Sequence, residues 1–444
     1  MAEVAPFRAL RYELGDRGDL GRVVTPPYDV INAEQQERFY SSSPHNVIRL
    51  ELNRVRPEDD RQNNRYTRAA AHLRTWLDQG VLRPEPRPAM YLSRTTYRDH
   101  QGHTRTRTGF FTLLRVEDFA RGVVLPHEKT FTDHKEDRFQ LTKATHANIS
   151  PIFALYPDDE NQVVRALEEI PPAAPPLEFT DPLGLDQSLA VIDDPQVHQR
   201  VQQLMADKRI YIADGHHRYE TALNYRDYMR KKHPQAGPRA PWEYVLVYLC
   251  SMSDPGLAVF PCHRLVPQLG GFAARDFLLH AEPYFEHQAL PLGPAGSEDL
   301  EALTAALARA GERGSSLGLV SAESDSFHLL TLKPQVMEQT FPEMPEPLRE
   351  LDVVVLTNLV LERILGFDDS YRDRVHTIEY LSDLKEVIGR VRGGDARLAF
   401  VLNPTRLEQV KAVAREGLIM PRKATYFYPK VLTGLVIYHM DSQG

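Results

Sequence analysis

The chain has 444 residues, of which 42% are hydrophobic and 26% are charged, values that are typical of a globular protein. Lysine and arginine total 53 against 61 acidic residues, and the resulting net charge of −8 argues against a general nucleic-acid binder. No apolar run approaches the roughly 20 residues of a membrane-spanning helix, and no basic and apolar leader opens the chain. Cys250 and Cys262 are too few for a disulfide framework or a four-cysteine zinc site, so we expect a cytoplasmic protein.

Proline-rich stretches indicate boundaries between structured regions, because proline stops helices and holds the chain extended. We predict an N-terminal region of residues 1–83, a core of residues 84–265 with the active site, and a C-terminal α/β region of residues 266–444. The succession of predicted helices and strands indicates an α/β protein with mixed sheets, with α+β as the alternative.

Apolar periodicity and turn residues predict the individual elements. In chain order they are a helix over residues 64–79, strands over 89–97, 108–116, 152–156 and 209–213, a helix over 218–231, strands over 244–250 and 257–260, a hairpin of 316–320 with 327–332, an apolar helix over 351–365, a strand over 397–402 and a helix that begins near Pro404.

The stretch from Tyr211 to Ala222 holds the most informative chemistry. An apolar strand runs into Asp214 and Gly215, and a helix then opens with the basic residues His216, His217 and Arg218. Glycine permits a tight turn, and the unpaired N–H groups and positive dipole of a helix N-terminus bind phosphate. Alternatively, Asp214 only caps the helix and the histidines are solvated. Three basic side chains at the positive helix end favour the phosphate site, because they would repel one another unless an anion binds.

A second stretch, residues 126–138, is densely charged and follows the apolar residues 123–125. Glu128 has the chemistry of a general base or a magnesium ligand, and His127 that of a group that binds phosphate or orients a substrate. The alternative is a solvated charged loop. Arg138 and Asn148 follow as further polar candidates.

Two more stretches carry candidate binding residues. The double proline before Tyr28 and Asp29 holds an extended backbone, from which both side chains can face a pocket. Residues 420–430 are basic and aromatic and can close a site for an anionic ligand through Lys423. These stretches can equally be a rigid turn and an edge strand whose lysines prevent aggregation.

Several common catalytic patterns are missing from the sequence. There is no P-loop, no G-x-G-x-x-G after a strand, no G-x-S-x-G elbow and no H-E-x-x-H, since position 131 is phenylalanine after His127-Glu128. Classical P-loop kinases, Rossmann dehydrogenases, α/β-hydrolases and zincins therefore lose support.

The chain resembles an uncharacterised bacterial and archaeal family catalogued as domain-of-unknown-function family 1015. The matching stretches extend over nearly the whole chain, and the Asp-Gly-His-His-Arg stretch is specific in this setting. They are residues 26–30, 45–48, 126–130, 137–138, 150–153, 212–222, 263–264 and 420–430 with Gly434.

The strand–Asp-Gly-His–helix pattern is also similar to the phosphate-binding turn of the ParB/sulfiredoxin-like fold, which includes kinases that phosphorylate free serine. This resemblance implies a ParB/sulfiredoxin-like core in which Gly215, His216, His217 and Arg218 hold nucleotide phosphates. It further implies that Glu128 is a base toward a substrate hydroxyl. No cysteine stands in the turn, which argues against peroxiredoxin repair.

Three hypotheses follow for the function. The first is a Mg²⁺-dependent phosphotransferase that uses ATP or ADP on a small hydroxylated metabolite such as an amino acid. The others are a metal-dependent hydrolase and a non-catalytic nucleotide sensor with a partner protein. For the first, the candidate residues are Glu128, Asp214 and His127 for catalysis, Asp214 and Glu128 for Mg²⁺, and Tyr28, Asp29, Arg138, Asn148 and Lys423 for the substrate.

Overall fold

The structure is a computed structural model that describes residues 1–13, 19–99, 102–128, 132–172, 174–267, 274–294, 299–368 and 378–443, without the side chains of residues 132–134 and 274–275. The chain forms two compact units. Unit 1 comprises Met1–Pro126, Thr130–Ala258 and Pro429–Gly444, and unit 2 comprises His127–Lys129 and Val259–Tyr428. The three predicted domains, residues 1–83, 84–265 and 266–444, are a different division of the chain, and that division stays a prediction.

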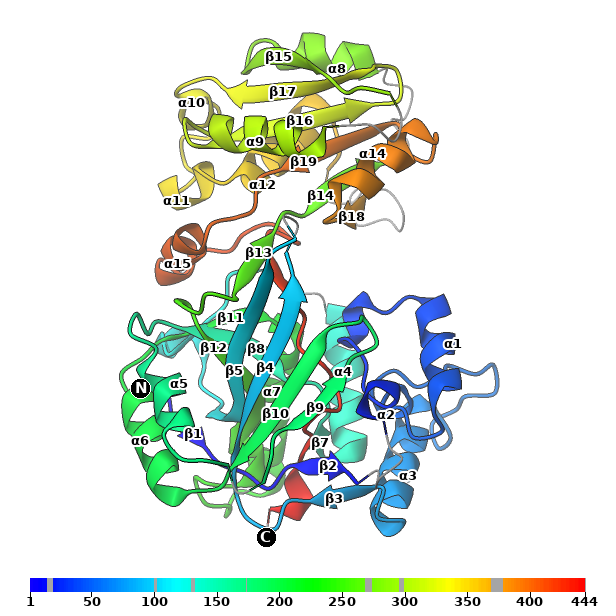
Figure 1. Cartoon of the computed structure of the whole chain (residues 1–444), viewed down its shortest axis with the longest axis vertical. Coiled ribbons are helices and arrows are strands. Elements are labelled where there is room, and N and C mark those ends of the chain that lie inside the picture. Colours follow the sequence, from blue (N-terminus) through cyan, green and yellow to red (C-terminus); the bar gives the residue numbers. More distant parts are fainter. Residues whose placement is uncertain are drawn as a thin grey trace. The chain divides into compact units, whose positions relative to one another are not determined.

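Unit 1 is built on a nine-stranded mixed sheet in the order β6-β11-β8-β12-β5-β4-β10-β9, with β1 paired to β5 outside this path (Figure 1). Two small sheets, β2-β3 and β7-β21, complete it. Most neighbours are antiparallel, while β11 with β6 and β12 with β8 are parallel. The strands are β1 (Val4–Ala5), β2 (Leu10–Tyr12), β3 (Leu82–Pro84), β4 (Met90–Arg98), β5 (Thr104–Arg115), β6 (Val124–Leu125), β7 (Ala147–Asn148), β8 (Ile152–Tyr156), β9 (Leu177–Thr180), β10 (Asp186–Ile192), β11 (Ile210–Asp214), β12 (Tyr244–Ser251) and β21 (Tyr438–His439).

Helices cover one face of this sheet and bury a large apolar core against it. The helices of unit 1 are α1 (Ala33–Ser42), α2 (Ile48–Glu51), α3 (Arg65–Asp78), α4 (Thr132–Thr145), α5 (Gln162–Glu168), α6 (Pro195–Met205) and α7 (His216–Lys232). Apolar residues of α5, α6 and α7 pack with alternate residues of the strands, such as Ile210 and Ile212 of β11. Asp194 caps α6 and Pro195 opens it, a pairing that favours a sharp helix start.

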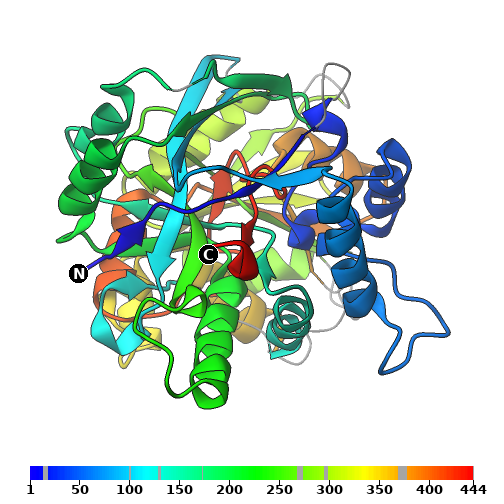
Figure 2. The same cartoon turned by 90° about the horizontal axis from the view of Figure 1, so that it is seen from below.

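The N-terminal and C-terminal segments run beside each other in unit 1, and Figure 2 shows them in blue and red. The Leu10 N–H donates to the Ile437 carbonyl at 2.9 Å, and Thr25 exchanges two backbone hydrogen bonds with Thr433. The last residues of the chain are thereby fixed next to its first ones.

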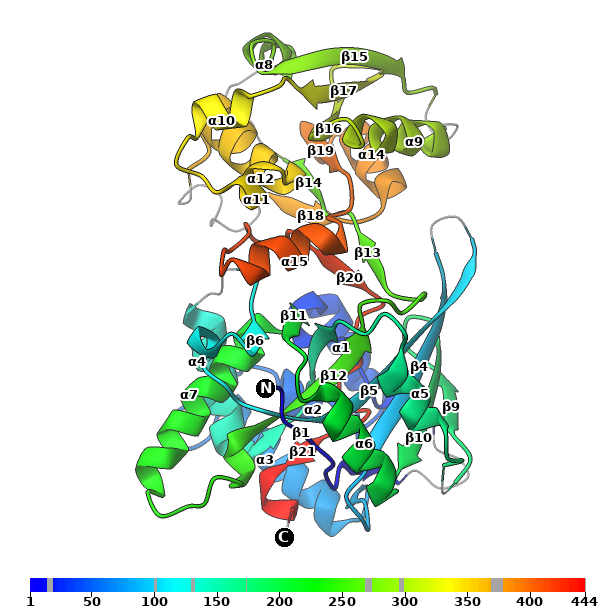
Figure 3. The same cartoon turned by 90° about the vertical axis from the view of Figure 1, so that its left-hand side faces the viewer.

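Unit 2 contains a six-stranded sheet in the order β15-β17-β16-β19-β14-β18, with a separate pair β13-β20. One core joins the sheet to α8, α10, α12 and α15, and a second joins its other face to α9 and α14 (Figure 3). The elements are β13 (Ala258–Phe260), β14 (His263–Val266), β15 (Phe285–Pro291), β16 (Ser316–Ser321), β17 (Ser326–Leu332), β18 (Glu379–Leu381), β19 (Leu398–Leu402), β20 (Tyr426–Tyr428), α8 (Ala274–Ala281), α9 (Leu300–Gly311), α10 (Val336–Thr340), α11 (Glu346–Arg349), α12 (Asp352–Val354), α14 (Leu384–Arg392) and α15 (Leu407–Arg415).

The predicted mixed α/β class is confirmed, but the apolar helix predicted over residues 351–365 is only partly α-helical. After α12 the chain continues as a π-helix over Val355–Ile364. Within it the Thr357 hydroxyl donates to the Val353 carbonyl at 2.7 Å. That carbonyl would otherwise pair with the α-helical N–H of the same residue, and such competition loosens a helix. No described helix is long and apolar enough to cross a membrane.

Candidate functional site

The turn between β11 and α7 is centred on Gly215, the N-cap of the helix. Its φ of 93° lies in the left-handed region, and its carbonyl accepts from the Tyr219 N–H at 3.0 Å. A Cβ at this position would lie 2.7 Å from Nε of Arg218. Glycine is therefore required twice, for its backbone conformation and for the close packing of the arginine.

Asp214 does not occupy the N-cap position, so the interpretation of this residue as only a helix cap is wrong. Its carboxylate lies between two cations: Oδ2 accepts from Arg218 at 3.0 Å, and Oδ1 is 3.6 Å from Nζ of Lys430. Arg218 also donates to the Pro151 carbonyl. Its side chain is 9% exposed, and its Nε has no hydrogen-bond partner among the described residues.

The histidines of the turn differ from each other. His216 is buried, and burial lowers its pKa to about 3, against the opposing effect of Asp214. His216 is therefore neutral near pH 7, while His217 is half-buried. The expectation of three mutually repelling cations is corrected, because Arg218 is paired with Asp214 and His216 carries no charge.

A second polar group lies in unit 1 around Arg138 of α4. This guanidinium contacts Glu51 at 3.0 Å and lies 4.2 Å from the centroid of the Tyr28 ring. Glu51 in turn accepts from the Ser150 hydroxyl at 2.6 Å. Arg138 is thus a buried, fully partnered arginine, and Tyr28 is buried beneath it.

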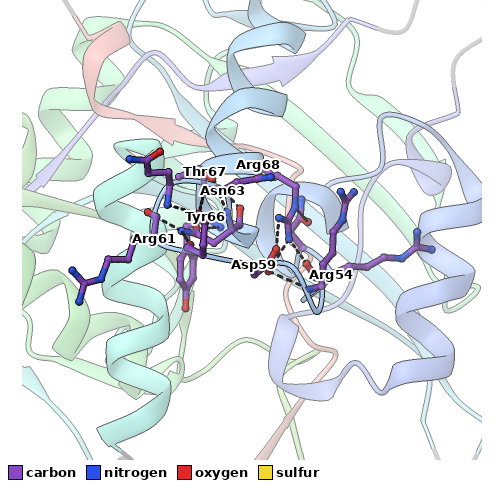
Figure 4. A network of polar contacts seen from close by, with 12 residues as sticks. Arg54, Asp59, Arg61, Asn63, Tyr66, Thr67 and Arg68 are labelled. Atoms are coloured by element: carbon purple, nitrogen blue, oxygen red, sulfur yellow. Dashed lines mark hydrogen bonds and ion pairs between the residues drawn. The ribbon is translucent and has the colours of Figure 1, made fainter.

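Helix α3 supports this group from the side. The Tyr66 hydroxyl donates to Asp137 at 2.7 Å, and Asp137 accepts from Nε of Arg138 at 2.8 Å. Figure 4 shows the start of α3, where Arg68 pairs with Asp59 at 2.5 Å beside Tyr66. These contacts hold the first turns of α3 in place and so position the tyrosine.

Arg138, Arg218, Glu51, Ser150 and Asn148 line one cavity of about 40 Å³ in unit 1. That volume accommodates a few water molecules and no nucleotide. Asn148 is committed to the backbone, since its side-chain oxygen accepts from the Leu246 N–H at 3.1 Å. Asp29, by contrast, is exposed.

The remaining predicted residues, His127, Glu128 and Lys423, lie together in unit 2. His127 is fully buried, and its Nε2 is 3.1 Å from the Thr425 hydroxyl. Glu128 Oε1 accepts from the backbone N–H of Lys423 at 2.9 Å, so this hydrogen bond is made by the lysine backbone and not by its side chain. Residues 129–131 lie outside the described residues. Because the turn belongs to unit 1, the meeting of these two groups in one site stays a prediction.

Sequence reasoning missed three polar residues of unit 1, namely Lys430, Glu51 and Arg107. Lys430 closes the basic stretch 420–430, so charge alone could have selected it. No local signal distinguishes Glu51 or Arg107, which meet their partners only in the folded chain. Among the described residues, no group of three metal-ligating side chains is placed to hold a metal ion.

Solved structures share only a distant likeness with this chain. A free serine kinase variant in complex with AMP covers 73% of this chain and 92% of its own, at 13% identity and a TM-score of 0.36. A conserved hypothetical protein from Pyrococcus furiosus covers 75% and 97%, at 11% identity and a TM-score of 0.36. SbnI from Staphylococcus aureus, with a C-terminal truncation, covers 75% and 90%, at 9% identity and a TM-score of 0.34. At these TM-scores, none of the three assigns a fold or an activity to this chain.

No curated protein matches the chain. The family model described as "Protein of unknown function (DUF1015)" matches residues 4–354, which is most of the sequence and includes the turn at Asp214. The chain therefore belongs to this family of proteins of unknown function.

Proposed function

We propose that this protein is a Mg²⁺-dependent phosphotransferase that moves a phosphoryl group from ATP or ADP to a hydroxyl of a small, amino-acid-like metabolite. The observation that carries the proposal is the turn at Gly215, where β11 ends and the 17-residue helix α7 begins. The unpaired N–H groups at the start of a long helix bind anions, and the left-handed glycine makes the tight turn that presents them. The helix has no acidic residue in its first turn to offset its dipole.

In this proposal the turn binds the nucleotide phosphates, with donors from the first turn of α7 and from His217. The buried Arg218 holds Asp214 and braces the turn through the Pro151 carbonyl. Phosphoryl transfer depends mainly on positioning and on charge stabilisation, which such a rigid turn supplies.

Mg²⁺ would be held by Asp214 and Glu128 together with the phosphates. Because protein sites for Mg²⁺ use one or two carboxylates plus substrate phosphates and water, a cage of three protein ligands is not required. The Asp214 carboxylate stands at the start of α7, and each of its oxygens would be shared between Mg²⁺ and a neighbouring cation, Arg218 or Lys430. The ion would neutralise the charge of the phosphates.

Glu128 would accept the proton of the substrate hydroxyl as that oxygen attacks the terminal phosphorus, while the nucleotide leaves with one phosphate fewer. Its Oε1 already receives the Lys423 N–H, which fixes the carboxylate in one orientation. The exposed Asp29 is the proposed partner of the substrate amino group, and Lys423 the proposed partner of its carboxylate.

The test combines binding with turnover. We expect ATP or ADP to raise the unfolding temperature of the wild type by mass action, and Arg218→Lys to reduce that rise. We also expect transfer of ³²P to a hydroxylated amino acid with Mg²⁺, and at least about 100-fold less transfer with Glu128→Gln. Binding without turnover on any acceptor would favour the nucleotide sensor, and no binding of either nucleotide would refute the proposal.

A further inference from the structure

Three side chains of unit 2 form a series of hydrogen bonds that the proposed function does not use. The Ser324 hydroxyl is 2.9 Å from Nε2 of His328, and Nδ1 of His328 is 2.9 Å from Nε2 of His287. A hydroxyl that pairs with a base, while a third group orients that base, is the arrangement that activates a nucleophile. The three groups here are a serine and two histidines, with His328 in the middle.

The sheet of unit 2 fixes the two histidines. In the antiparallel pair β15-β17, His287 is the register partner of Leu330. Side chains alternate between the two faces of a strand, so His328, two residues before Leu330, lies on the same face as His287. His328 is 8% exposed, whereas His287 is exposed. The buried ring is thus held between the serine and a partner at the surface.

The turn between β16 and β17 fixes the serine, which is half-buried. The Ser324 N–H donates to the Ser321 carbonyl at 3.3 Å, and the Ser324 hydroxyl oxygen accepts from the Ser326 N–H at 3.2 Å. The second contact is common for a serine in a turn, and by itself it would make Ser324 only structural. The same N–H also stabilises negative charge on the serine oxygen when its proton leaves.

The position of one proton decides whether these groups can react. Burial, and then the neighbouring His287, lower the pKa of His328, so this ring is neutral near pH 7. A neutral imidazole has one N–H and one nitrogen with a free electron pair. When the proton is on Nδ1 and is donated to His287, Nε2 can accept the proton of the Ser324 hydroxyl. His328 then has the position and the charge state of a general base.

We propose that Ser324 is a nucleophile, activated by His328, with which unit 2 hydrolyses small esters. The serine oxygen attacks the carbonyl carbon of the ester, and its proton passes to Nε2 of His328. The bond from that carbon to the alcohol oxygen then breaks, and the alcohol leaves with the proton from His328. Water hydrolyses the acyl-serine by the same route and releases the acid.

His287 is a positioning residue in this reaction. It accepts the Nδ1–H of His328 and so keeps that ring in the reactive tautomer, the part that a carboxylate has in other triads. The exposed acids Glu323 and Asp325 flank Ser324 in the sequence, so a neutral or cationic ester suits the site better than an anionic one. The reaction is separate from the phosphotransfer proposed for the turn at Gly215.

The experiment treats the full chain with a fluorophosphonate, which reacts with activated serines and releases fluoride, and locates the adduct by peptide mass spectrometry. p-Nitrophenyl acetate then measures hydrolysis of a neutral ester. We expect the adduct on Ser324, and both rates at least about 100-fold lower in Ser324→Ala and His328→Gln. The control is Ser253→Ala, because the exposed Ser253 donates its hydroxyl to Asp159, and this variant should react as the wild type does.

The role of His287 has a readout of its own, the pH profile of labelling. The labelling rate should rise with pH as His328 loses its proton. Because His287 lowers the pKa of His328, His287→Gln should move the midpoint of this rise to a higher pH. An unchanged midpoint would remove His287 from the mechanism.

Two results would overturn the proposal: a wild type without an adduct on Ser324, or an adduct that forms equally fast in His328→Gln. Should His328→Gln not fold, the pH profile of the wild type decides the question, because a serine without a histidine base shows no rise near the pKa of a histidine. Neither result affects the proposed phosphotransfer, which uses other residues.

Discussion

Replacement of Gly215 by alanine tests how the turn is built. The new Cβ would have to accept a φ of 93°, and it would lie 2.7 to 3.0 Å from three atoms of the Arg218 guanidinium. Arg218 has little room to move, because its side chain is buried and pairs with Asp214 and the Pro151 carbonyl. We therefore expect two separate costs, one in the backbone and one in the arginine contacts.

The magnitude follows from adding these costs. The left-handed conformation costs an alanine about 1–2 kcal/mol. The displaced guanidinium loses hydrogen bonds to charged and buried groups, which are each worth about 1.5–3 kcal/mol. With one of these hydrogen bonds lost, Gly215→Ala should therefore lower the free energy of unfolding by about 2.5–5 kcal/mol. Gly184→Ala is the matched control, because Gly184 has a φ of 80° and nothing within 4 Å of its Cβ position, so only the backbone cost applies.

The assay is urea unfolding followed by tryptophan fluorescence. Both tryptophans of the chain, Trp76 and Trp242, lie in unit 1, so the signal reports on the unit that holds Gly215. In an Arg218→Ala background, Gly215→Ala should cost only the backbone component, as a double-mutant cycle would reveal. Equal destabilisation by Gly215→Ala and Gly184→Ala would refute the argument that Arg218 packs on this glycine.

Three further outcomes are expected. His216 has a pKa of about 3 in the native state because of burial, whereas an unfolded histidine titrates near 6.5, so the unfolded state binds the extra proton between these values. The free energy of unfolding should therefore fall as the pH drops below 6.5. At pH 5 the wild type should have lost about 2 kcal/mol of it, a loss that His216→Gln should not show. Urea unfolding at several pH values measures both. Arg107→Met leaves the buried Pro429 carbonyl without its donor and should destabilise unit 1 by about 2–4 kcal/mol in the tryptophan assay. An unchanged free energy of unfolding would show that the hydrogen bond from Arg107 to Pro429 is dispensable. Glu128→Gln keeps an oxygen that can accept the Lys423 N–H, so its circular-dichroism melting curve should match that of the wild type. Its ³²P transfer should fall at least about 100-fold, and full transfer would exclude Glu128 as the base.

Local signals predicted the turn because they are contained in a dozen residues. The apolar strand before Asp214, the glycine and the helix after it are all present, and the strand and helix ends differ from the prediction by one or two residues. Asn64, which caps α3, is a similar local signal for the start of that helix. The caps of α6, α9 and α14, which are Asp194, Asp299 and Asp383, offered equal signals for helices that were not predicted.

Long-range partners account for what local patterns did not reveal. The burial that neutralises His216 arises only in the folded chain, and Arg218 and Asp214 also contact Pro151 and Lys430, which lie far from the turn in the sequence. Charge density therefore suggested a cluster of unpaired cations where the fold has a partly neutralised one. The same reason explains why Lys423 was selected from the basic stretch although Lys430 is the residue beside Asp214.

Hydrogen–deuterium exchange of the full chain, with and without ADP, tests the central claim most directly because it locates a bound nucleotide along the sequence. We expect slower exchange in the peptides that contain residues 212–222, and unchanged exchange in the exposed turn around Gly184. ADP that binds without protecting residues 212–222 would place the nucleotide elsewhere and contradict the assignment of the Asp214 turn as the phosphate site.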